Sequence, residues 1–100
     1  MLYSSYGMKR FDWDIEKNKK LIKDRNISFE EIIIFIEQGK VLDIVDNPNP
    51  RYHHQKMFVL DVEGYIYVIP FVETNEAYFL KTIFPSRKAT KEYLQGGESL

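Results

Sequence analysis

Hydrophobic residues recur at helical spacing in a segment near the start of the chain. In residues 15–25, Leu21 and Ile22 fall on one side of a helix and four lysines fall on the other. Asp14 precedes this segment as a capping residue, and Asn26 follows it as a residue that tolerates a left-handed backbone. The pattern therefore predicts a helix over residues 15–25.

A second helix is predicted over residues 29–38. Ser28 and Glu31 have the spacing of a capping box, in which each side chain bonds to the backbone N–H of the other residue. Gly39 is placed to end the helix. The segment is apolar nearly all round, so we expect it to be buried on most sides.

The pattern changes to strand-like runs in the second half of the chain. Short connections between the runs predict an antiparallel meander. Pro70 interrupts the middle run, which predicts a bulge or a position at the sheet edge, because proline has no N–H to donate. The predicted strands are residues 56–62, 65–72 and 77–84, preceded by a shorter strand at 41–45 and a rigid loop at 46–50.

Ser86 is placed to cap a last helix that extends to about residue 94. The order helix, helix, strands, helix predicts an α+β fold, with helices on one face of an antiparallel sheet and the other face at least partly open. A length of 100 residues predicts a single domain over residues 1–100. We expect its core at residues 8–94, with flexible segments at residues 1–7 and 95–100.

The composition narrows the class of protein. An apolar fraction of 44% with 15% aromatic residues is typical of a folded chain, and the absence of cysteine excludes disulfides and thiolate zinc sites. No metal or phosphate-loop motif is present, so we expect no cofactor. No apolar run approaches the length of a membrane span, and residues 1–7 lack the features of a signal peptide. We expect a cytoplasmic protein without a membrane partner.

The net charge of −1 conceals an uneven distribution. Residues 1–25 carry seven basic and four acidic side chains, residues 26–79 carry three and nine, and residues 80–93 carry four and one. Two basic segments thus flank an acidic middle. If the fold brings these segments together, they form a basic patch that suits nucleic acid; otherwise the lysines are solvated helix residues.

Ser86, Arg87 and Lys88 form the best candidate for an anion site. A helix N-terminus offers free N–H groups to an anion, and the two cations add charge and a bidentate guanidinium. The alternative is an ordinary charged first turn. Cations there oppose the helix dipole at a cost of about 0.3–1 kcal/mol, which favours a role in binding a ligand.

Lys81 is a second cation of interest. Strand alternation places it with Phe79 and Ile83, so that it either extends to the sheet edge or points into a cleft. Lys56, at the start of the meander, could meet it across the sheet.

Aromatic and histidine side chains supply further candidates. Tyr65, Tyr67 and Tyr93 could stack on nucleic-acid bases, although strand aromatics usually belong to the core. His53 and His54 are adjacent, which makes them poor ligands for a shared metal ion. They are either polar loop residues or groups that exchange protons near neutral pH.

Two segments of the chain together resemble the BrnT family of bacterial type II toxins. Phe11-x-Trp13-Asp14-x-x-Lys17, with Leu21 and then Ile27-Ser28-Phe29-Glu30-Glu31, resembles the opening of that family, and Ser86-Arg87-Lys88-Ala89-Thr90-x-x-Tyr93 resembles its end. The resemblance covers about half of the chain. It implies a RelE-like α+β fold, ribonuclease activity and neutralisation by a small antitoxin with a ribbon-helix-helix part. It also implies that the protein contacts operator DNA only through that antitoxin.

The chain departs from the family pattern in its middle. Asp24-Arg25-Asn26 stands where the family has Lys-His-Gly, and residues 51–56 lack the family's spacing of His and Glu-Arg. Arg87 and Lys88 match the family motif, whereas the general base stays open.

These observations lead to a first hypothesis, a metal-independent endoribonuclease. A base would take the proton of an RNA 2′-OH, and Arg87 would stabilise the charged transition state with Lys81 or Lys88. His54 or His53 would serve as base or acid, with Lys56 as the substitute. Ser86 and Tyr93 would complete the substrate-binding residues.

Two rival hypotheses remain. The chain could be a toxin-like module without catalytic activity that binds a DNA-binding antitoxin. It could also be a small-ligand or structural α+β domain.

Overall fold

The computed structural model describes residues 2–3 and 9–95 and shows an α+β protein, which confirms the predicted class. Most of the expected flexible segments at 1–7 and 95–100 therefore lies outside the described residues. The elements in chain order are β1 (Leu2–Tyr3), β2 (Arg10–Trp13), α1 (Ile15–Arg25), α2 (Phe29–Glu37), β3 (Val41–Asp46), the 3-10 turn η1 (Pro50–Tyr52), β4 (Lys56–Val62), β5 (Tyr65–Glu73), β6 (Ala77–Leu80), β7 (Phe84–Pro85) and α3 (Arg87–Leu94).

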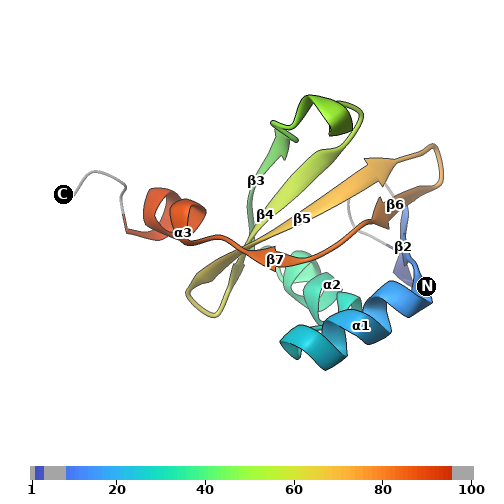
Figure 1. The fold of residues 1–100 in the computed structure, drawn as a ribbon, viewed down its shortest axis with the longest axis horizontal. Helices are drawn as coiled ribbons and strands as arrows, with labels where there is room; N and C mark the ends of the chain where they lie inside the picture. Colours follow the sequence, from blue (N-terminus) through green and yellow to red (C-terminus); the bar gives the residue numbers. More distant parts are fainter. Residues whose placement is uncertain (1, 4–8, 96–100) are drawn as a thin grey trace.

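The strands form one mixed sheet in the order β1-β2-β6-β5-β4-β3, with β7 also paired to β5 (Figure 1). The pairs β3–β4, β4–β5 and β5–β6 are antiparallel, whereas β2 runs parallel to β6. The prediction of a purely antiparallel sheet was therefore wrong. The sequence pattern did not predict β2, because this strand has only four residues and its hydrogen-bond partner, β6, lies far along the chain.

Local capping signals fix both early helices as predicted. The Asp14 carboxylate accepts the N–H groups of Glu16 and Lys17, and Asn26 ends α1 with a φ of 55°. α2 begins with the predicted capping box, since the backbone N–H of Ser28 and that of Glu31 each bond to the other residue's side chain. Gln38 is the C-cap of α2, which ends one residue earlier than predicted.

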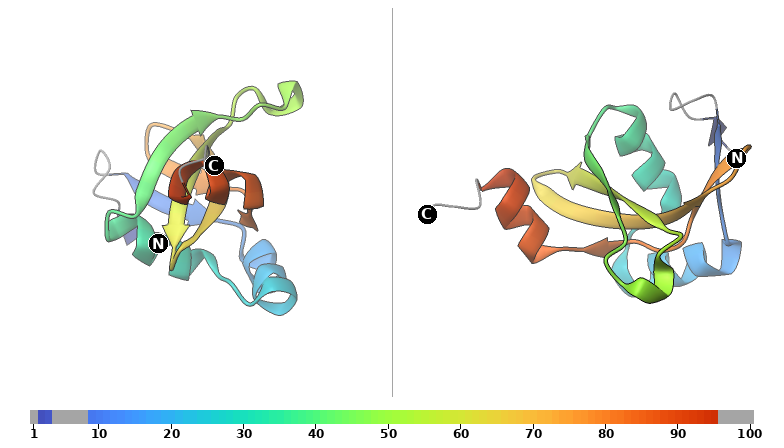
Figure 2. Two further views of the ribbon diagram at one scale, coloured as in Figure 1. Left: turned by 90° about the vertical axis from the view of Figure 1, so that its left-hand side faces the viewer. Right: turned by 90° about the horizontal axis from the view of Figure 1, so that it is seen from above.

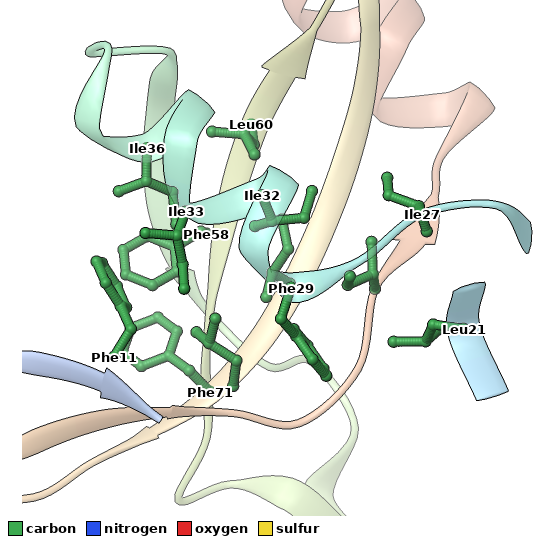
Figure 3. Close-up of a cluster of buried hydrophobic side chains, with 13 residues drawn as sticks. Phe11, Leu21, Ile27, Phe29, Ile32, Ile33, Ile36, Phe58, Leu60 and Phe71 are labelled. Atoms are coloured by element: carbon green, nitrogen blue, oxygen red, sulfur yellow. The ribbon is translucent and has the colours of Figure 1, made fainter. Parts of the chain in front are cut away.

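The two helices cover one face of the sheet and enclose the main core (Figures 1 and 3). The rings of Phe58 and Phe71 stack there with centroids 4.2 Å apart. α2 is less enclosed than its composition suggested, because Ile34 is 53% exposed. The buried core residues are Phe11, Leu21, Ile27, Phe29, Ile32, Ile33, Ile36, Phe58, Leu60, Ile69, Phe71, Leu80 and Ile83.

The opposite face of the sheet carries a smaller apolar cluster. Val59, Ile66 and Val68 are buried there, and Ala89 of α3 packs against them. α3 thus covers one end of this face, away from α1 and α2, as Figures 1 and 2 show. The rest of the face is where the candidate site lies.

The predicted strand at residues 77–84 is broken into β6 and β7. Residues 81–83 leave the ladder opposite Pro70, whose carbonyl oxygen accepts the N–H of Lys81 at 2.8 Å. In a strand the N–H and C=O of one residue point to the same side, so the missing N–H of Pro70 faces this break. Pro70 lies in an interior strand, so of the two predicted alternatives, a bulge or a position at the sheet edge, the edge was wrong.

Candidate functional site

A cleft in the described part of the chain lies between α3 and the loop that joins β3 to β4. It has a volume of about 670 Å³, and we call it the α3 cleft. Its floor is the sheet face opposite α1 and α2. That floor is apolar and is formed by Val45, Met57, Val59, Val68, Pro70 and Phe84.

One wall of the α3 cleft is the helix itself. The helix begins at Ser86, whose Oγ accepts the N–H of Ala89 at 3.0 Å, as predicted for an N-cap. Thr90 is a buried residue of the same helix, and its hydroxyl accepts the N–H of Ile66 and donates to the carbonyl of Ser86. This contact to β5 fixes which side of α3 faces the cleft. Ser86, Lys88, Ala89, Glu92 and Tyr93 line it.

The last turn of α3 is also tied to the sheet. The hydroxyl of Tyr93 donates to a carboxylate oxygen of Asp43 on β3, at 2.8 Å. This hydrogen bond is the main reason why the pKa of Tyr93 is raised above its ordinary value, with further contributions from partial burial and from the charges of Asp43 and Glu92. Tyr93 therefore keeps its proton throughout the neutral range.

The break between β6 and β7 supplies the side wall. Lys81 and Thr82 line the α3 cleft, and the Nζ of Lys81 lies 5.2 Å from the centroid of the Phe79 ring. Two residues after Lys81, the backbone carbonyl of Ile83 accepts a hydrogen bond of 2.6 Å from Arg25 at the end of α1. Lys81 is thus exposed while Ile83 is buried in the main core, so the predicted continuous strand alternation does not hold here.

The sequence pattern did not predict the wall of the cleft that faces α3. It is formed by the loop around η1, where Gln55 is buried and its side chain accepts a bond from Asn47. The Asn49 side chain accepts the N–H of Arg51 and so begins the 3-10 turn. Loops rich in Asn and Pro are common, so composition gave no signal that this one faces a site. Asn47, Pro48, Asn49, Tyr52 and Gln55 line the cleft.

Four of the predicted site residues meet in this cleft: Lys81, Ser86, Lys88 and Tyr93. Arg87, at the first position of α3, is exposed and does not line it. The two cations of the cleft come from the C-terminal basic segment alone.

The predicted acid–base residues lie elsewhere. His53 and His54 follow η1 with exposed rings 5.7 Å apart, centroid to centroid. His54 and Lys56 line a separate, smaller cavity of about 390 Å³. Lys56 shares its face of the sheet with Phe58, which places it on the side of α1 and α2, and its Nζ lies 3.6 Å from Asp46. Lys56 and Lys81 therefore occupy different cavities.

The basic patch that the charge distribution allowed does not form across both ends of the chain. Among the described residues, the α3 cleft contains no side chain from residues 9–25. The lysines of α1 are on the helix that covers the other face, and Lys19 and Lys20 pair with Glu16 and Asp24. The contact between the N-terminal basic segment and the chain beside the cleft is the hydrogen bond from Arg25 to the carbonyl of Ile83.

Glu92 is a carboxylate of the α3 cleft that the sequence pattern did not single out as a site residue. It lies one helical turn after Lys88 and lines the α3 cleft with it. The spacing of four residues was the available signal, because such residues share a helix face. In the described part of the chain, no group of three potential metal ligands is found, and no helix is long and apolar enough to cross a membrane.

Comparison with protein-family models, with curated proteins and with solved structures found no match.

Proposed function

We propose that this chain is the toxin of a bacterial type II toxin–antitoxin system, with a RelE-like fold and endoribonuclease activity that needs no metal ion. The observation that carries the proposal is the meeting of Lys81, Ser86, Lys88 and Tyr93 in one cleft. These residues come from the two segments on either side of the strand β7, and three of them belong to the motif that resembles the BrnT family.

The cleft has the chemistry of a single-stranded RNA site. Lys81 and Lys88 supply positive charge for a phosphate, and the Ser86 hydroxyl supplies a polar contact at the helix start. Tyr52 and Tyr93 face a largely apolar floor on which an unstacked base can rest. Arg87, exposed beside Lys88, would contact a neighbouring phosphate outside the cleft.

The proposed reaction uses the RNA's own nucleophile. A base removes the 2′-OH proton, the 2′-oxygen attacks the adjacent phosphorus, and the bond to the 5′-oxygen breaks. Cations at the phosphate stabilise the charge that develops in the transition state. Lys88 and Lys81 are placed for this task, with Arg87 in support.

The partner in this proposal is a small ribbon-helix-helix antitoxin, through which the complex contacts operator DNA. Support for it comes from the resemblance to the BrnT family. We expect the antitoxin to cover the α3 cleft, since occupation of the RNA site is the direct way to inhibit it.

The test is RNA cleavage by the purified chain, together with growth after its expression without antitoxin. Wild type should cut RNA and leave a 2′,3′-cyclic phosphate, and RNA with a 2′-deoxy residue at the scissile position should bind without being cut. Lys88→Ala and Arg87→Ala should each reduce cleavage. Lys91→Ala is the matched control, because Lys91 is exposed on α3 but does not line the cleft.

A second candidate is a toxin-like binding module without catalysis. The observation in its favour is that His53, His54 and Lys56 do not line the α3 cleft. This candidate predicts that wild type binds an antitoxin encoded by a neighbouring gene, yet neither cuts RNA nor stops growth. Cleavage by wild type, lost in Lys88→Ala, would falsify it.

A further inference from the structure

Lys88 and Glu92 place opposite charges on the same side of α3. They are four residues apart in an eight-residue helix, and both line the α3 cleft. Ser86 at the helix start and Tyr93 at its end line the same wall. A phosphate held by Lys88 would therefore have a carboxylate about one helical turn away, since four residues rise about 6 Å along the axis.

Glu92 differs chemically from the other ionisable residues of the cleft. It is the carboxylate among the described residues that line the cleft, and carboxylates are common general bases in enzymes. Lys81, Lys88, Tyr52 and Tyr93 are the remaining ionisable residues among the described lining. The hydroxyl proton of Tyr93 is in addition held in a hydrogen bond to Asp43.

The carboxylate of Glu92 is also available. Within residues 9–95, no ion pair within 4.0 Å engages Glu92 or Lys88. The nearby carboxylate of Asp43 does not line the cleft and accepts the Tyr93 hydroxyl instead. Among the described residues that line the cleft, Glu92 is thus the carboxylate, and no ion pair within residues 9–95 holds it.

We propose that Glu92 is the general base of the RNA cleavage, an inference that rests on the function proposed above. Its carboxylate takes the proton from the 2′-OH as the bond between the 2′-oxygen and phosphorus forms. The bond from phosphorus to the 5′-oxygen breaks, and that oxygen takes a proton from water. The products are a 2′,3′-cyclic phosphate and a 5′-hydroxyl, and Glu92 returns its proton to solvent.

The test compares cleavage and binding by Glu92→Gln, Glu92→Asp and wild type, under single turnover. Loss of a general base should lower the rate constant of Glu92→Gln by about 100-fold or more, while its RNA affinity stays within about threefold of wild type. Glu92→Asp keeps a carboxylate and should recover part of the rate. Glu76→Gln is the matched control, because Glu76 is exposed and outside the cleft.

The outcomes separate this inference from the proposed function. If wild type cuts RNA and Glu92→Gln cuts it at the same rate, Glu92 is not the base and the endoribonuclease proposal stands. Loss of RNA binding in Glu92→Gln would assign Glu92 to binding and overturn the catalytic role. If wild type cuts no RNA, the proposed function fails and this inference fails with it. Thermal unfolding of each variant confirms that the proteins compared are folded, and Glu92→Asp preserves charge if Glu92→Gln is unstable.

Discussion

The hydroxyl of Tyr93 donates a hydrogen bond of 2.8 Å to the carboxylate of Asp43, and so joins the last turn of α3 to the edge strand β3. Near its start the same helix is fixed to β5 by the bond between Thr90 and Ile66. An eight-residue helix is too short to be stable alone in water. These two bonds hold the helix and the cleft wall in place, together with the bond from the Ser86 N–H to the Ile66 carbonyl and the packing of Ala89.

Replacing Tyr93 with Phe should remove the bond to Asp43 with a small loss of stability. Tyr93 is 38% exposed, so we expect a decrease of no more than about 1 kcal/mol in the free energy of unfolding. Denaturant unfolding at neutral pH measures it. A loss several times larger would mean that the ring, rather than its hydroxyl, holds the helix.

The same bond predicts a dependence on alkaline pH. The pKa of Tyr93 is raised in the folded state, above the value of about 10 expected when unfolded. Its contribution to stability is therefore complete below the unfolded value and is lost as the pH rises through the folded one. The stability difference between wild type and Tyr93→Phe should shrink over this alkaline range. A difference that stays constant from neutral to strongly alkaline pH would contradict the prediction.

Replacing Thr90 with Val should be more costly, although the two side chains have nearly the same shape. The variant leaves the buried N–H of Ile66 without its acceptor, which costs about 1–3 kcal/mol. Thr90→Ser keeps the hydroxyl and is the control for the loss of the bond. We expect Thr90→Val also to weaken RNA binding, because α3 loses one of the hydrogen bonds that tie it to β5. Equal stability of the Val and Ser variants would show that the hydroxyl is dispensable.

Local signals predicted the first part of the fold well. Asp14, Asn26 and the pair Ser28 and Glu31 determine helix ends through bonds to nearby backbone, so short sequence patterns reveal them. β2 escaped prediction because its partner, β6, is remote in sequence. Pro70 predicted an irregularity in its own strand, but the break lies after Leu80 on the neighbouring strand, where no local pattern marked it.

The part of the candidate site that lies close in sequence to the helix cap could be predicted. Lys81, Ser86, Lys88 and Tyr93 belong to one short stretch of chain, and the cap at Ser86 marks where it turns. The loop at residues 47–55 reaches the cleft because it joins β3 and β4, which are paired strands of the sheet that forms the floor. No local pattern records that proximity.

Asn18 should be a large contributor to the packing of α1 on α2. It is buried, donates to Glu30 at 2.7 Å and accepts the N–H of Phe29 at 2.8 Å. Asn18→Ala leaves that buried N–H unpaired and should lower the free energy of unfolding by about 1–3 kcal/mol. Glu30→Gln keeps an oxygen acceptor and should change stability by only a few tenths of a kcal/mol. The prediction fails in chemical denaturation if the two variants are equally stable.

RNA binding should respond to salt through Lys81 and Lys88. Each cation that neutralises a phosphate of a single strand contributes about 0.7 to the slope of log affinity against log salt concentration. Lys81→Gln and Lys88→Gln should each weaken binding and reduce the slope by about this amount. Fluorescence anisotropy with a 2′-O-methyl oligonucleotide measures both quantities without cleavage. Lys91→Gln should leave them unchanged; a similar reduction there would point to a diffuse effect of helix charge.

The parallel pairing of β2 with β6 has a consequence for how the protein is made. Residues 10–13 emerge from the ribosome early, but their partner at residues 77–80 emerges only after α1, α2 and three further strands. Contacts between such distant segments slow folding, because a large loop must close first. The wall that carries Lys88 and Glu92 is synthesised later still. Translation therefore delays the appearance of the α3 cleft until the residues of the other described elements have been made.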